Sequence, residues 1–163
     1  GLVMKDNSGD ANKFIEEFSK VYRYILNNQD KELVELKGEL EFIRPYIFLL
    51  QKRFGEGLQV NINIPEKYNS YYVIPVALQM LIENAIKHNV VSRQRPLYIE
   101  LHANGNDTLV VKNNRQPRQA EEPSTRIGLE NIIKRYELIS DRNVIIRQEP
   151  GVFEVTLPLL HLN

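Results

Sequence analysis

The chain has 163 residues, of which 42% are hydrophobic, so it is long enough to bury a substantial core. Its 21 Lys and Arg residues balance its 21 Asp and Glu residues, and this zero net charge argues against a nucleic-acid-binding protein. The absence of Cys excludes disulfides, thiolate catalysis and Cys-ligated metals. No apolar run approaches the roughly 18 residues of a membrane-spanning helix, so we expect no direct membrane contact.

Two amphipathic helices are predicted in the first third of the chain. Residues 1–10 are polar and small, and we expect them to be frayed. Apolar residues then recur every three or four positions over 11–26 and again over 33–54. Pro45 predicts a kink or a division in the second helix, which ends at Gly55 and Gly57. We interpret residues 1–55 as a helical segment that resembles half of a bundle.

Strands are predicted from residue 58 onward by alternating apolar and polar residues. They lie at 58–64, 97–102 and 109–111, with a terminal hairpin over 144–157. Helices are predicted at about 75–88 and 128–139. This order predicts an α+β fold for residues 56–163, preceded by the two long helices. The expected architecture is a two-layer α/β sandwich, with two helices on one face of a mixed, mostly antiparallel sheet.

The helix at about 75–88 gathers four polar side chains on the face opposite its apolar residues: Glu83, Asn84, Lys87 and His88. A solvated helix face with a Glu83–Lys87 pair is the simple alternative. The residue types also suit a nucleotide site, because an Asn oxygen can ligate Mg²⁺ and a Lys can meet phosphates as a point charge.

Two further segments have a composition that suits nucleotide binding. Residues 124–131 join a long polar loop to a helix, and a helix N-terminus favours phosphate. Gly128 would let the backbone approach an anion closely, although an ordinary helix start explains it equally well. Asn113 and Asn114 end a strand at the mouth of the same loop, where a simple turn is the alternative.

Taken in chain order, these segments resemble the motifs of one superfamily. Residues 81–89, Leu-Ile-Glu-Asn-Ala-Ile-Lys-His-Asn, resemble the N box of the GHKL ATPases. Residues 111–114 and 126–131 lie where the first and second G boxes lie. The family with the greatest similarity is that of the LytS-like (YehU-like) sensor histidine kinases. Residues 14–26 also resemble the second dimerisation helix of that family.

The resemblance implies the Bergerat ATP-binding fold, with ATP and Mg²⁺ as cofactors. It implies that Asn84 ligates Mg²⁺ and that Lys87 and His88 approach the phosphates. Glu83 is the implied catalytic residue. Residues 115–127 would form an ATP lid. The remaining implied nucleotide contacts are Asn113, Asn114, Arg126 and the backbone of Gly128 and Leu129.

Several positions depart from the pattern of the superfamily. Asn113 stands where most relatives outside this family have an Asp that reads the adenine amino group. Arg115, Pro117 and Arg126 stand where the G boxes have glycines. The His-Phe-x-Phe-Asn-like stretch that carries the phosphoacceptor His is absent, and we expect it upstream of Gly1 in a longer protein.

The resemblance thus implies the catalytic core of a two-component kinase that works as a homodimer and passes phosphate to a response regulator. This core would be a cytoplasmic part of a bacterial inner-membrane sensor. One alternative is a non-catalytic dimerisation or regulatory module with degenerate G boxes. Another is a different GHKL ATPase, such as an anti-sigma-factor kinase, which explains the first two helices poorly.

Overall fold

The computed structural model describes residues 2–118 and 127–162, and it begins with two long helices. These are α1 (Leu2–Asn28) and α2 (Leu36–Phe54), as the apolar periodicity predicted. The expectation of a frayed first segment was wrong, because α1 already starts at Leu2. Of the kink or division predicted at Pro45, the division was wrong. α2 continues through it, although proline cannot donate to the carbonyl of Glu41.

A five-stranded sheet forms the second layer of the molecule. Its strands, in spatial order, are β2 (Leu58–Asn63), β4 (Leu97–Asn104), β5 (Thr108–Asn114), β7 (Val152–Pro158) and β6 (Ile145–Glu149). β2 runs parallel to β4, and the other neighbouring pairs are antiparallel. The predicted mixed, mostly antiparallel sheet is therefore confirmed. The parallel pair requires a crossover, which includes α3 (Ala77–His88).

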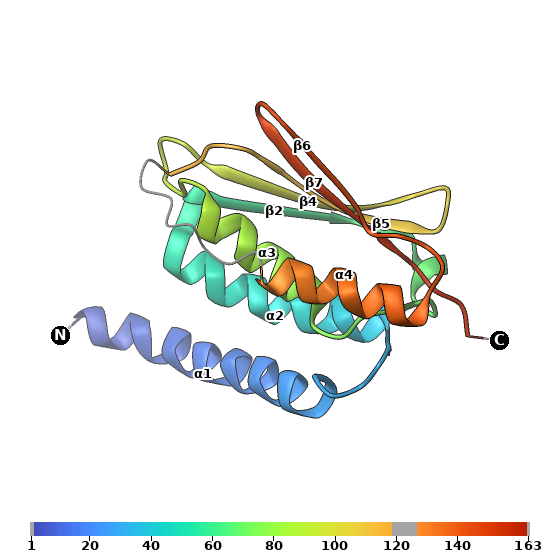
Figure 1. Ribbon diagram of the computed structural model, residues 1–163. Helices are drawn as coiled ribbons and strands as arrows, with labels where there is room; N and C mark the ends of the chain where they lie inside the picture. Colours follow the sequence, from blue (N-terminus) through green and yellow to red (C-terminus); the bar gives the residue numbers. More distant parts are fainter. Residues whose placement is uncertain (1, 119–126, 163) are drawn as a thin grey trace.

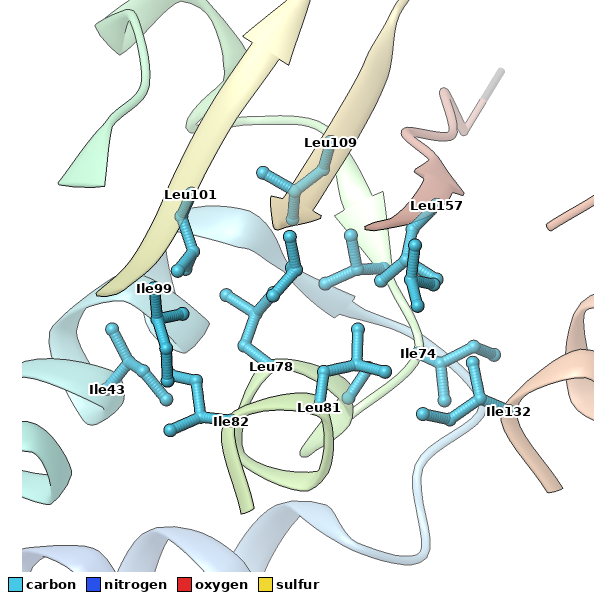
Figure 2. Packing of buried hydrophobic residues seen from close by; sticks show 14 of the residues in the cluster. Ile43, Ile74, Leu78, Leu81, Ile82, Ile99, Leu101, Leu109, Ile132 and Leu157 are labelled. Atoms are coloured by element: carbon cyan, nitrogen blue, oxygen red, sulfur yellow. The ribbon is translucent and has the colours of Figure 1, made fainter. Parts of the chain in front are cut away.

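The helices lie together on one side of this sheet (Figure 1). α3 and α4 (Ile127–Ile139) cover it as predicted, and α2 packs beside them, which the sequence did not indicate. Figure 2 shows Ile43 of α2, Leu78 of α3 and Ile132 of α4 meeting sheet residues such as Ile99 and Leu109. α1 lies on the outer side of α2 (Figure 1). The architecture is thus a two-layer α/β sandwich with an additional outer helix.

The position of α2 bears on the predicted division of the chain into a helical segment and an ATP-binding domain. Leu36, Leu40 and Ile43 of α2 are buried in the same core as Leu58 and Leu97 of the sheet. A division into 1–55 and 56–163 stays a prediction. The shared core shows that α2 packs against the second segment, since its apolar face is covered by α3 and the sheet.

A small second sheet joins the start of α2 to the segment that leads into α3. β1 (Val34–Glu35) pairs with β3 (Tyr72–Val73), and the Leu36 N–H donates to the Tyr71 carbonyl at 2.8 Å. Two short 3₁₀ helices, η1 (Gly55–Gly57) and η2 (Glu66–Tyr68), flank β2. Strands of two residues are too short to alternate visibly, so the sequence did not predict this pairing. Within residues 2–118 and 127–162, no helix is long and apolar enough to cross a membrane.

Candidate nucleotide site

α3 has the two faces that its sequence predicted. Leu78, Leu81 and Ile82 are buried against the sheet and the neighbouring helices. On the other face Glu83 and Lys87 are exposed, whereas Asn84 and His88 are half-buried. The structure therefore brings the four predicted polar residues of α3 together on one accessible surface. Gln79, one turn earlier, donates a hydrogen bond from Nε2 to Oε2 of Glu83.

The start of α4 packs directly on α3 beside these polar residues. A Cβ atom at Gly128 would lie 2.9 Å from Cε of Met80, so only glycine allows this approach without moving Met80. Met80 precedes Asn84 by about one helical turn on the same side of α3. The N-terminus of α4 consequently lies near Asn84. The side chain of Leu129 is buried in the core, so only its backbone N–H can serve a ligand. Arg126 lies outside the described residues.

The two amides at the end of β5 point to opposite faces of the sheet. Asn113 is buried and shares the helix-facing side with Leu109 and Val111, following the two-residue period of a strand. Its Nδ2 donates to the carbonyl of Asn114 at 2.8 Å. Asn114 lies on the other face, where Oδ1 accepts the Tyr98 N–H at 2.7 Å. The side chain of Asn114 therefore ties β5 to β4, and a contact with nucleotide stays a prediction.

Asn89, directly after α3, joins that helix to the segment following β5. Its buried side chain donates to the Ala85 carbonyl and accepts the Gln116 N–H, both at 2.8 Å. Sequence reasoning assigned Asn89 no role, although an Asn just after a helix is a common C-terminal signal.

Arg118 strengthens the same junction. Its Nε donates to the Asn89 carbonyl at 2.9 Å, and its Nη2 donates to the Ile86 carbonyl at 3.3 Å. A guanidinium at the carbonyl end of α3 also suits the helix dipole. The first part of the predicted lid, 115–118, is thus fastened to α3. Residues 119–126 lie outside the described part of the chain.

α2 contributes an aromatic side chain to the edge of the polar face. Burial raises the pKa of Tyr46 to about 12, and the carboxylate of Glu83 contributes to the same shift. Tyr46 also stacks on Phe42, with ring centroids 6.2 Å apart. The candidate catalytic residue Glu83 therefore lies close to the packing between α2 and α3.

No group of three or more His, Asp or Glu side chains suited to a metal occurs within residues 2–118 and 127–162. As a predicted metal ligand, Asn84 would need phosphate oxygens and water to complete the shell of Mg²⁺. Its neutral oxygen, on the same helix face as the Lys87 ammonium and the His88 imidazole, would suit a Mg²⁺–triphosphate.

A hollow of about 720 Å³ lies over the strands, and its lining includes Asn113 and Asn114 but no residue of α3. Several of its side chains, among them Gln59, Tyr98 and Glu100, alternate with core residues and so face away from the helices. We place the candidate site at α3, because the charged and amide groups suited to phosphate gather there.

Comparison with known proteins shows what the chain is similar to. A model of the Histidine kinase family matches residues 1–58. The sensor histidine kinase/phosphatase LytS of Staphylococcus aureus (strain MRSA252) is 33% identical over 93 residues, which are 57% of this chain and 16% of that protein. Over this stretch the chain is similar to the LytS sensor histidine kinases. It spans only about a sixth of the length of the LytS proteins that it matches, which are covered to 16%.

Solved structures show that the chain has the fold of histidine kinase catalytic domains. The catalytic domain of histidine kinase ThkA superposes with a TM-score of 0.55 at 17% identity, over 80% of this chain and 100% of that one. The cytoplasmic segment of histidine kinase QseC gives 0.53 at 16% identity, over 94% and 95%. At such identities the likeness concerns the fold alone, and it confirms the predicted α/β sandwich.

Proposed function

We propose that this chain is the ATP-binding core of a two-component sensor histidine kinase, with the nucleotide held between α3, the end of β5 and the start of α4. The observation that carries the proposal is the packing of Gly128 on Met80. This contact supports a site in which backbone N–H groups at the N-terminus of α4 would donate to phosphates held by a metal at Asn84.

Each residue would have a distinct task in this site. The Asn84 oxygen would hold Mg²⁺, which when bound neutralises charge between phosphate oxygens. Lys87 and His88 would contact the phosphates, and the N–H groups of Gly128 and Leu129 would donate to them. These interactions position the triphosphate, and positioning with charge neutralisation is most of what phosphoryl transfer requires.

The adenine base would be recognised by the amide of Asn113, and the phosphoacceptor His by the carboxylate of Glu83. The Asn113 side chain can accept a hydrogen bond from the adenine amino group through Oδ1, since its Nδ2 donates to the Asn114 carbonyl. Glu83 is exposed on the same face as Asn84 and could hydrogen-bond the N–H of an incoming imidazole. We propose that this imidazole belongs to a His outside these 163 residues and that its phosphate passes to an Asp of a response regulator.

α1 supports a homodimer as the working state. Phe14, Ile15, Phe18, Tyr22 and Leu26 are between 41% and 62% exposed, although all are large and apolar. They recur every three or four residues and so form one stripe along α1. An exposed stripe of this kind favours burial against another helix.

We propose that the parent protein is a membrane sensor, with this part on the cytoplasmic side.

Calorimetry with Mg²⁺ and a non-hydrolysable ATP analogue tests the nucleotide site. We expect Asn84→Ala to abolish measurable Mg²⁺-dependent binding and Lys87→Ala to weaken it, because a diffuse charge contact is easier to replace than a metal ligand. Asn12→Ala and Lys134→Ala are matched controls, as both residues are exposed on other helices. Undiminished binding by folded Asn84→Ala would overturn the proposed site. Absence of binding by the unaltered chain would favour the alternative of a non-catalytic dimerisation or regulatory module.

A further inference from the structure

A carboxylate of α2 is buried at the N-terminus of α3. The side chain of Glu39 is fully buried, and its Oε2 accepts the backbone N–H of Val76 at 3.2 Å. Oε2 also accepts the hydroxyl of Tyr24, from α1. Its Oε1 is buried and has no hydrogen-bond partner within residues 2–118 and 127–162. One carboxylate of α2 thus contacts both α1 and the residue before α3.

Two opposing effects act on the pKa of Glu39, and burial, which raises it, is the larger. Burial raises its pKa, whereas the Tyr24 hydroxyl and the backbone amides of Val76, Leu78 and Ala77 lower it. Amides at the start of a helix are the donors that have no partner within the helix. Glu39 therefore serves α3 as a capping group supplied from another helix, since no side chain of the adjoining residue caps it.

Val76, the residue before α3, has a backbone conformation that requires such support. Its φ of 64° lies in the left-handed region, which is rare for a β-branched residue. A conformation of this kind persists only where the surroundings hold it. Here the side chain of Val76 is buried with Val21 of α1 and Phe42 of α2, while its N–H is held by Glu39.

Tyr24 links this support to the docking of α1. Its ring stacks on Phe42, with centroids 4.3 Å apart and planes 9° from parallel, and its hydroxyl reaches Glu39. Met80, which packs against the same cluster, is the residue that Gly128 approaches. The surface on which α1 docks is therefore continuous with the contact between α3 and α4.

We infer that Glu39 is a positioning residue, which couples the docking of α1 to the geometry of α3 through the Tyr24–Glu39–Val76 hydrogen bonds. If α1 moves away, Glu39 loses the hydroxyl of Tyr24 and the left-handed Val76 loses Val21. The start of α3 then loosens. The part of this inference that concerns nucleotide rests on the proposed function. Because such coupling is reciprocal, a nucleotide bound at α3 would favour docked α1 by the same factor.

Amide hydrogen exchange of the whole chain, without nucleotide, tests the coupling of α1 to α3. Tyr24→Phe removes one hydroxyl and keeps the ring on Phe42, while Tyr22→Phe is the matched control, since Tyr22 is 56% exposed. We expect exchange at the Val76 amide to become about tenfold faster in Tyr24→Phe and unchanged in Tyr22→Phe. The Val111 amide of β5 reports general destabilisation and should stay protected. Unchanged exchange at Val76, or equal acceleration at Val111, would overturn the coupling.

A double-mutant cycle with Glu39→Gln separates coupling from two independent defects. Glu39→Gln keeps the size of the side chain and an oxygen for the Val76 N–H. If the two residues act through one link, adding Tyr24→Phe to Glu39→Gln should change Val76 exchange much less than Tyr24→Phe alone. Fully additive effects would contradict the inference.

The nucleotide half is tested separately with Mg²⁺ and the ATP analogue. We expect Tyr24→Phe to weaken affinity several-fold and Tyr22→Phe to leave it unchanged. Equal affinity in Tyr24→Phe, despite faster Val76 exchange, would overturn the nucleotide half and keep the link from α1 to α3. If the unaltered chain does not bind the analogue, the proposed function fails, and the exchange data still decide the link.

Discussion

The side chain of Asn89 accepts a 2.8 Å hydrogen bond from the backbone N–H of Gln116. This bond joins the end of α3 to the segment after β5, two places that are separated by β4 and β5 in the chain. The same side chain donates to the Ala85 carbonyl, so one buried amide satisfies a helix end and a loop together.

Asn89→Ala should therefore destabilise the fold locally and globally. We expect the free energy of unfolding to fall by about 1–3 kcal/mol, because one buried and one half-buried backbone group lose their partner. Exchange at the Gln116 amide should accelerate. Urea unfolding measures the first effect, and Asn61→Ala, at an exposed position of β2, is the control expected to change it by less than about 0.5 kcal/mol. A protected Gln116 amide in Asn89→Ala would show that the bond is dispensable.

Gly57 is required by close packing. A Cβ atom there would lie 3.0 Å from the carbonyl carbon and 3.2 Å from the Cα of Ser92, and neither backbone atom can move freely. Gly57→Ala should cost about 1–3 kcal/mol of unfolding free energy, as overpacking does elsewhere. Gly105→Ala is the control, because nothing lies within 4 Å of the added carbon. Similar denaturation midpoints for the two variants would refute the packing argument.

The raised pKa of Tyr46 predicts that the folded chain loses stability at alkaline pH. Its folded pKa of about 12 exceeds the ordinary value of 10.0 because of burial and Glu83. Between these values the unfolded chain releases a proton that the folded chain keeps, so the contribution is complete below pH 10 and falls as the pH rises. The difference amounts to at most about 3 kcal/mol.

Urea unfolding at pH 9, 10 and 11 checks this prediction. Tyr46→Phe should flatten the alkaline decline relative to the unaltered chain, whereas Tyr98→Phe, at an exposed position, should not. Parallel pH profiles for the unaltered chain and Tyr46→Phe would count against the assignment.

The apolar stripe of α1 should drive self-association. We expect Phe18→Glu to shift the chain toward monomer, since it places a charge in the middle of the stripe. Asn12→Glu adds the same charge at a polar position of α1 and should leave association unchanged. Sedimentation equilibrium over a range of concentrations measures the effect. A chain that is monomeric at every concentration would contradict the proposed homodimer.

None of the three histidines should act as phosphoacceptor in this chain. His88 belongs to the α3 site, His102 lies on β4 beside Glu100 at 3.5 Å, and His161 lies near Asp107 at 3.8 Å. Incubation with γ-labelled ATP and Mg²⁺ should give no acid-labile, base-stable label. Stoichiometric label on any of the three would require a different acceptor from the one proposed.

Much of the architecture could be predicted because the local periodicity of apolar residues determines it. The alternation at 58–64 predicted β2, and the three-to-four spacing predicted α1, α2 and α3 with its polar face. Periodicity of this kind needs only neighbours in the chain, since each element must bury one face. The N-box resemblance of residues 81–89 likewise pointed to the histidine kinases before any contact was known.

Long-range contacts were decided by the tertiary structure alone. Glu39 occurs within an amphipathic pattern as one polar residue among several, and only the fold brings Tyr24 and Val76 to it. The same holds for the pairing of β1 with β3 and for the bond between Asn89 and Gln116. In the sequence, each of these residues looks like an ordinary polar or apolar residue of its own segment. Their meeting depends on how α1, α2 and α3 pack, and that packing is determined by the buried volume of the whole core rather than by any segment.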